Sequence, residues 1–137
     1  PRALANPNHM IVDANFSTLW PTTAESLGYH TLIAVLNSSW STATLECLGT
    51  ALAGGALKLE ATHIRRLSLP PVAGEQAVKL GVLGQQLIAA GPGCSEPVIR
   101  QIDIEIAECL GGTRHGEEIS NRLRDLAQQK LSHRSSK

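Results

Sequence analysis

Three helical patterns follow one another in the second half of the sequence, and they limit the possible folds more than any other feature. Apolar residues recur there at intervals of three and four, as on the buried face of a helix. The apolar sets are Val78, Val82, Leu83, Leu87 and Ile88, then Ile99, Ile102, Ile106 and Leu110, then Ile119, Leu123, Leu126 and Ala127. Ser95 and Pro97 form a good start for the second helix. We therefore expect about three helices, with Arg124 on the outside of the third and a frayed end after Leu131.

Another helical pattern begins near Leu32 in the first half. We expect this helix to run as far as the glycine pair Gly54-Gly55, which would stop it. Trp40 lies on its apolar stripe and is expected in the core. The run Asn37-Ser38-Ser39 contains weak helix formers, so it requires either a close helix contact or a polar face, and it is a candidate to touch another domain.

Extended patterns surround this helix. The residues up to Pro21 alternate loosely between apolar and polar, which predicts two short strands, and the stretch ALKLE predicts another. The expected fold class is therefore α+β, with a small mixed sheet and one covering helix over residues 1–72. A helical C-terminal segment over residues 73–137 follows, and the two parts can share a core.

The stretch AGGALKLEATHIRRLSLPP, residues 53–71, joins a strand to a basic helical turn and a double proline. Thr62 is the expected cap of the turn, and the prolines require an extended exit. Lys58, Arg65 and Arg66 have two interpretations. They contact DNA phosphates or base edges, or they are solvated charges with one arginine paired to Glu60.

Charge and composition exclude several classes of protein. The 137 residues carry 12 basic and 12 acidic side chains, so the chain lacks the basic excess of most stand-alone nucleic-acid binders. Aromatic residues make up 3%, too few for a platform of stacked bases. The end of the chain is its basic part, with six basic and three acidic residues from position 114 onward. The three cysteines are far apart, which argues against disulfides and zinc and favours a reducing compartment.

The motifs reveal no catalytic constellation. Phosphate-loop, nucleophile-elbow and zinc-protease patterns are missing, and the five histidines never fall at metal-ligand spacing. Asp103 and Glu105 lie two apart on a helix, where side chains do not face each other, so we interpret them as a solvated charged face. The sequence shows no signal peptide and no apolar run that could span a bilayer. We therefore expect a cytoplasmic protein without membrane contact.

Residues 32–72 resemble the C-terminal specificity region of adenine-specific DNA methyltransferases from bacterial restriction–modification and phage-defence systems. Such regions show a helix ending in a Leu-Asn-Ser-Ser element, a glycine pair before a strand with a lysine, a basic turn and a proline exit. The matching parts here are Leu36-Asn37-Ser38-Ser39, Gly54-Gly55, Leu57-Lys58-Leu59, Ile64-Arg65-Arg66-Leu67 and Leu69-Pro70. The stretches VDANFSTLWP and IRQIDIEIAECLG are similar to the preceding strand and to a later helix of that family.

The resemblance implies the non-catalytic part of such an enzyme. The family's chemistry needs a glycine loop for S-adenosylmethionine and an Asn/Asp-Pro-Pro-aromatic motif, and neither occurs in this sequence. The chain, which starts at Pro1 and has no cofactor of its own, is then expected to be a piece of a longer polypeptide. It would position double-stranded DNA for a separate catalytic domain. The residues implied to contact DNA are Lys58, Arg65, Arg66, Gly54, Gly55 and His63.

These residues also have structural interpretations. Gly54 and Gly55 can be a helix C-cap alone, and His63 fits a surface or capping residue. The alternative for the whole chain is a structural or dimerisation domain of the same type of enzyme, without direct DNA contact. Its helices from Gly74 to Leu131 would then pack on the rest of the polypeptide or on a second copy, which the zero net charge and the amphipathic helices favour.

Overall fold

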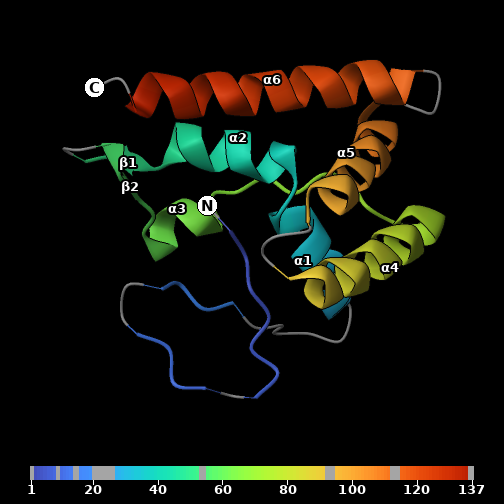
Figure 1. Cartoon of the computed structure of the whole chain (residues 1–137), viewed down its shortest axis with the longest axis horizontal. Helices are drawn as coiled ribbons and strands as arrows, with labels where there is room; N and C mark the ends of the chain where they lie inside the picture. Colours follow the sequence, from blue (N-terminus) through green and yellow to red (C-terminus); the bar gives the residue numbers. More distant parts are fainter. Residues whose placement is uncertain are drawn as a thin grey trace.

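The computed structural model describes residues 2–8, 10–13, 16–19, 27–52, 55–91, 95–111 and 115–135. Over these residues it has six helices and one antiparallel sheet of two short strands (Figure 1). The elements are α1 (Tyr29–Leu36), α2 (Ser39–Leu48), β1 (Thr50–Ala51), β2 (Leu57–Lys58), α3 (Ala61–Arg65), α4 (Gly74–Ala90), α5 (Glu96–Gly111) and α6 (Gly116–Ser135). The predicted combination of helices with a small sheet is confirmed, but the sheet is minimal and antiparallel rather than mixed.

The single helix predicted around Leu32 is two helices, because the chain bends at Asn37 and Ser38. Ser38 caps α2, since its Oγ accepts a hydrogen bond from the Ser41 N–H at 3.2 Å. The hydroxyls of Ser38 and Ser41 both donate to the Val35 carbonyl, at 2.6 and 2.7 Å. These bonds satisfy a carbonyl at the end of α1 inside the protein. The short polar side chains therefore form a buried corner and not an exposed polar face.

Helix α2 ends at Leu48, earlier than the glycine pair that was predicted to stop it. Gly49 follows as the C-cap, and a Cβ at this position would lie only 2.8 Å from Leu57 Cδ1. The strands then pair with Thr50 opposite Lys58. The helix is shorter than predicted because the chain turns into this hairpin.

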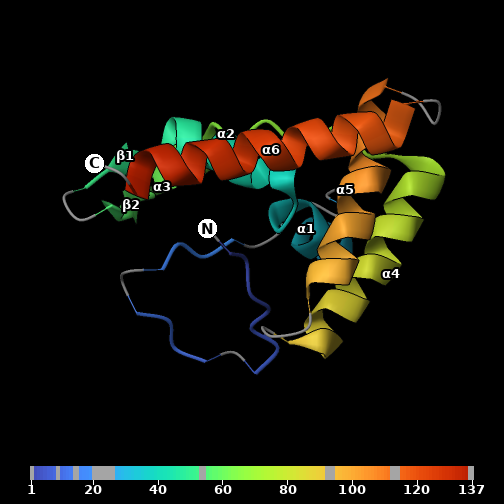
Figure 2. The same ribbon diagram turned by 45° about the horizontal axis from the view of Figure 1, so that its top comes forward.

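The described residues before α1 contain no strand, so the two short strands predicted there are not found in this part of the chain (Figure 2). Asn37 holds the segment in place. Its Oδ1 accepts from the Ala3 N–H at 3.1 Å, and its Nδ2 donates to the carbonyls of Ala3 and Ile33 at 3.0 and 2.9 Å. The Asn37 side-chain amide thus bonds both the N–H and the carbonyl of Ala3, the two groups that a neighbouring strand would otherwise bond.

One buried cluster joins residues from both sides of position 72. Its members are Ile33, Ala34, Val35, Leu80, Leu87, Ile102 and Ile106. Helices α1, α4 and α5 therefore share a core. Helices α1 and α4 cross closely, since a Cβ added to Gly84 would lie 1.9 Å from the His30 carbonyl oxygen. Nearby, Thr31 Oγ1 donates to the Ala77 carbonyl at 3.0 Å, which adds a polar contact to the same crossing.

The buried faces of the long helices match the predicted stripes only in part. Helix α4 buries Leu80, Gly84 and Leu87. Val78, Val82 and Ile88, which were predicted to be inside, are exposed. The side of α4 that carries Leu80, Gly84 and Leu87 faces the core because α1 packs closely against it, so the two valines and Ile88 remain outside. On α5 and α6, Ile102, Ile106 and Ala127 are buried, whereas Leu110 and Leu126 are exposed.

Helix α6 continues to Ser135, so the frayed end predicted after Leu131 is wrong. Arg134 in its last turn pairs with Glu46 of α2, with 2.9 Å between Nε and Oε2 and 3.2 Å between Nη2 and Oε1. The Glu46 side chain is 1% exposed and the Arg134 side chain 17% exposed, so the carboxylate is buried and the guanidinium partly buried. The last turn of α6 is therefore anchored on α2, and both views show α6 running along α2 (Figures 1 and 2).

Candidate nucleic-acid interface

The predicted basic residues lie at one end of the molecule, where the β1–β2 hairpin passes into α3 (Figure 1). We call residues 55–71 the basic corner. Lys58 projects from β2, and its Nζ lies 2.8 Å from Glu60 Oε1. Both side chains are about half exposed, so water screens the pair and the pair adds little to stability. The hydrogen bond and the opposite charge raise the pKa of Lys58 and lower the pKa of Glu60, so Lys58 keeps its positive charge.

Helix α3 is short, and its start is fixed by reciprocal bonds between Glu60 and His63. The Glu60 side chain accepts from the His63 backbone N–H, and His63 Nδ1 accepts from the Glu60 backbone N–H at 3.1 Å. This arrangement is a capping box in which histidine takes the usual place of glutamate or glutamine. Thr62, which was predicted to be the cap, has no part in the box. The structure therefore places His63 as a capping residue with its Nδ1 already occupied.

Arg65 and Arg66 end α3 and are both exposed. Neither forms an ion pair or a side-chain hydrogen bond with any residue that the structure describes. Lys58, and not an arginine, pairs with Glu60. The backbone N–H of Arg66 donates to the His63 carbonyl at 3.1 Å, which closes the last turn of α3. Two guanidinium groups are thus available to an anion.

The segment that follows α3 is hydrogen-bonded to α2. Trp40 Nε1 donates to the Ser68 carbonyl at 2.8 Å, and Pro70 is buried. Trp40 is half-buried and packs against the core cluster, close to the core position predicted for it. The capping box at the start and Trp40 at the exit therefore hold the segment that carries Arg65 and Arg66.

Of the two glycines predicted to approach DNA, Gly54 lies outside the described residues. Gly55 has a φ of +74°, a conformation in which other residues are strained. Its N–H donates to the Leu52 carbonyl at 3.2 Å, and its own carbonyl accepts from Arg134 Nη1. Gly55 is therefore part of the turn between β1 and β2 and not a helix C-cap.

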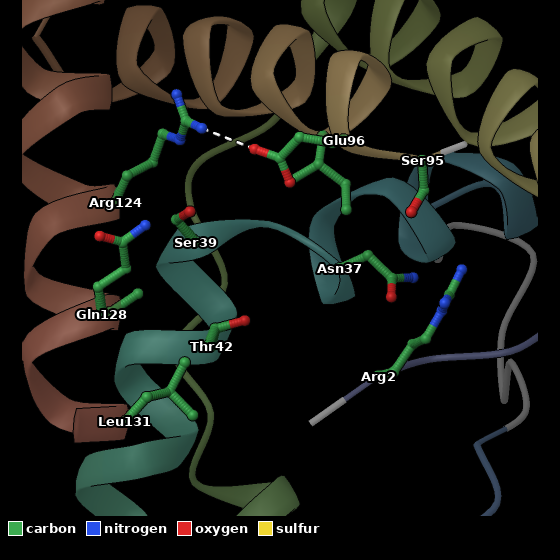
Figure 3. Close-up of a pocket in the computed structure, with 11 residues that line it drawn as sticks. Arg2, Asn37, Ser39, Thr42, Ser95, Glu96, Arg124, Gln128 and Leu131 are labelled. Carbon is green, nitrogen blue, oxygen red and sulfur yellow. Dashed lines mark hydrogen bonds and ion pairs between the residues drawn. The ribbon is translucent and has the colours of Figure 1, made fainter. Parts of the chain in front are cut away.

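A polar pocket of about 310 Å³ lies elsewhere, between the N-terminal segment, the α1–α2 bend, α5 and α6 (Figure 3). Arg124 and Glu96 meet at its edge, with 2.7 Å between Nη2 and Oε1. Arg124 was predicted to be outside, but its side chain is only 25% exposed. Arg2 lines the pocket as well. Among the described residues that line the pocket there is no histidine or cysteine, so these residues offer no nucleophile paired with a histidine base.

Asp103 and Glu105 are buried, so the prediction of a solvated face is wrong. Asp103 accepts the Ser39 N–H and the Ser39 hydroxyl, each at 2.7 Å, and so caps the first turn of α2. Burial raises the pKa of Asp103, which the bonds from Ser39 and the charge of Arg124 partly oppose. Glu105 Oε2 lies 3.9 Å from Lys79 Nζ. Both carboxylates are enclosed because other helices pack around α5 on several sides.

Within the described ranges, no group of histidine, cysteine and acidic side chains is placed to hold a metal ion. None of the helices described combines the length and the apolar character that crossing a lipid bilayer requires. Comparisons with protein-family models, with curated proteins and with solved structures found no match for this chain. The family resemblance therefore stays a prediction, and the candidate site depends on the geometry of the basic corner.

Proposed function

We propose that this chain is the target-recognition region of an adenine-specific DNA methyltransferase of a restriction–modification system. The observation that supports this best is the pair Arg65 and Arg66, two exposed guanidinium groups without an ion pair in the described structure. They lie on a segment that is held at its start by the capping box and at its exit by Trp40. Lys58, on the strand that precedes α3, adds a third positive charge, which it shares with the exposed Glu60.

Two exposed arginines on a held backbone segment suit the DNA backbone. The planar guanidinium matches phosphate oxygens with two parallel hydrogen bonds, and such contacts set the register of a protein on the duplex. The zero net charge fits a module that makes few phosphate contacts. In this proposal a domain elsewhere in the polypeptide binds S-adenosylmethionine, flips the adenine and methylates it in the cytoplasm.

Fluorescence anisotropy with a labelled DNA duplex, at about 50 mM salt, tests the proposal. Arg65→Ala and Arg66→Ala should each weaken binding severalfold. Arg100→Ala is the matched control, because Arg100 is also exposed and has no ion pair in the described part of the chain. It lies on α5, away from the hairpin end (Figure 1), so its loss should change binding little. Absence of binding by the intact chain, or equal losses in all three variants, would contradict the proposal.

An interaction domain is the second candidate, and a separate observation favours it. Val78, Val82 and Ile88 of α4 are 68%, 48% and 40% exposed, so three apolar side chains of one helix are open to solvent. A partner that covers them would be a second copy or the rest of the polypeptide. Light scattering over a range of concentrations should then show a dimer that Val78→Ser weakens, whereas a monomer at all concentrations would exclude self-association through this face.

A further inference from the structure

The guanidinium of Arg134 connects three elements that meet at the basic corner. Its Nε and Nη2 bind the two carboxylate oxygens of Glu46 on α2, at 2.9 and 3.2 Å. Its Nη1 donates to the carbonyl of Gly55, which precedes β2. Arg134, in the last turn of α6, therefore bonds both to α2 and to the residue before β2. Figure 1 shows α2, α6 and the β1–β2 hairpin meeting at one end of the molecule.

A buried ion pair is by itself weak evidence for a gain in stability. The Glu46 side chain is 1% exposed and the Arg134 side chain 17% exposed. Removing two charges from water is so costly that a packed apolar pair of similar size is often as stable or more stable. A bidentate pair of arginine and carboxylate does, however, fix the distance and the relative orientation of its two partners.

We infer that Arg134 and Glu46 are positioning residues for DNA contact, an inference that rests on the proposed function. They hold Gly55 and thereby place Lys58, three residues later, where it meets a DNA phosphate. The hairpin needs this support because β2 pairs with only two residues of β1. Without Arg134, the connection before β2 loses its bond to the helices.

A positioning role and a direct role for Arg134 predict opposite changes. Glu46→Gln removes one negative charge and releases Arg134 from its ionic partner. DNA binding tightens if Arg134 itself contacts phosphate, and it weakens if Arg134 must hold Gly55. Asp125→Asn is the matched control, since it removes one acidic charge from the exposed face of α6, where Asp125 has no ion pair among the described residues.

The test is fluorescence anisotropy of the whole chain with a labelled duplex over about 50–200 mM salt. Glu46→Gln should weaken binding about fivefold, the lower end of typical coupling between two sites. The slope of log K against log salt should become shallower by about 0.9, because Lys58 loses one phosphate. Arg134→Lys keeps the positive charge but cannot form the bidentate pair with Glu46, so it should also weaken DNA binding. Asp125→Asn should bind at least as tightly as the wild type.

Tighter or unchanged binding by Glu46→Gln would overturn the inference. Circular dichroism first shows whether each variant is folded at the assay temperature. Failure of both Glu46→Gln and Arg134→Lys to fold would make the pair a requirement of the whole fold and would also overturn it. If the wild type does not bind DNA, the proposed function fails. Faster amide exchange at Lys58 in Glu46→Gln would still show that the pair holds the hairpin, and unchanged exchange would show that it does not.

Discussion

Gly84→Ala should destabilise this protein, although the same change in most helix interiors is stabilising. Alanine in place of glycine favours a helix by about 1 kcal/mol, because it restricts the unfolded chain. At position 84, however, the new Cβ would lie 1.9 Å from the His30 carbonyl oxygen and 2.7 Å from the carbonyl carbon, whereas real contacts of this kind stay beyond 3.0 Å. Helix α1 would have to move away from α4.

The magnitude follows from these opposing effects. Inserting a methyl group into a packed site costs about 1–3 kcal/mol, and the upper end applies when the obstacle is backbone that cannot rotate away. About 3 kcal/mol of strain less about 1 kcal/mol of helix propensity leaves a net loss of about 2 kcal/mol. Urea unfolding followed by circular dichroism measures this loss as a lower midpoint with an unchanged slope.

Gly81→Ala is the matched control on the same helix. A Cβ there would lie 3.3 Å from Thr31 Oγ1, an atom of a side chain that needs to move only slightly. Its free energy of unfolding should stay near that of the wild type or rise by up to about 1 kcal/mol. If Gly84→Ala were as stable as Gly81→Ala, the close crossing of α1 and α4 would be refuted.

Single contacts elsewhere in the fold give further expectations. Asp103→Asn should be at least as stable as the wild type at neutral pH, because burial raises the pKa of this carboxyl and the folded state loses stability as pH rises through the raised value. The free energies of unfolding of the two proteins should converge as the pH falls below 3.8, the ordinary pKa of an aspartate carboxyl. An Asp103 carboxyl that titrates below 3.8 by NMR would contradict this prediction. Trp40→Phe removes the bond to Ser68 and should lower the free energy of unfolding by about 1 kcal/mol in urea; an unchanged midpoint would mean that the bond does not hold the exit. Asn37→Ala should speed amide exchange at Ala3, and equal exchange in both proteins would show that the segment is held in another way.

The long helices could be predicted from the sequence, but the side of each helix that faces the core could not. Apolar spacing is local information, and it correctly indicated helices after position 73. The side of α4 that faces the core depends on where α1 crosses it. Val78 and Val82 are as apolar as Leu80, and Leu80 is inside because the side of α4 that carries it packs against other helices.

Polar residues were hardest to place from the sequence. Asp103 looks like part of a solvated face until Ser39, which is 64 residues away, is brought against it. Glu46 and Arg134 are 88 residues apart and follow no motif, so nothing local marks them as a pair. Short-range patterns carry no information about partners at such separations.

The basic corner was only partly predictable. The sequence brought Lys58, Arg65 and Arg66 close together because they are neighbours along the chain. The sequence did not show that Lys58 forms an ion pair with Glu60 or that His63 completes the capping box of α3. Nor did it show that both arginines have no ion pair in the described structure. These assignments depend on side-chain geometry, and they are what make the two arginines the best candidates for phosphate contact.

The salt dependence of DNA binding tests the central claim most directly. If Arg65 and Arg66 each contact one phosphate, the double variant Arg65→Ala/Arg66→Ala should have a slope of log K against log salt that is shallower by about 1.8 than that of the wild type. Arg100→Ala should keep the wild-type slope. Equal slopes for the double variant and the wild type would contradict the account, because these arginines would then release no counterions from DNA.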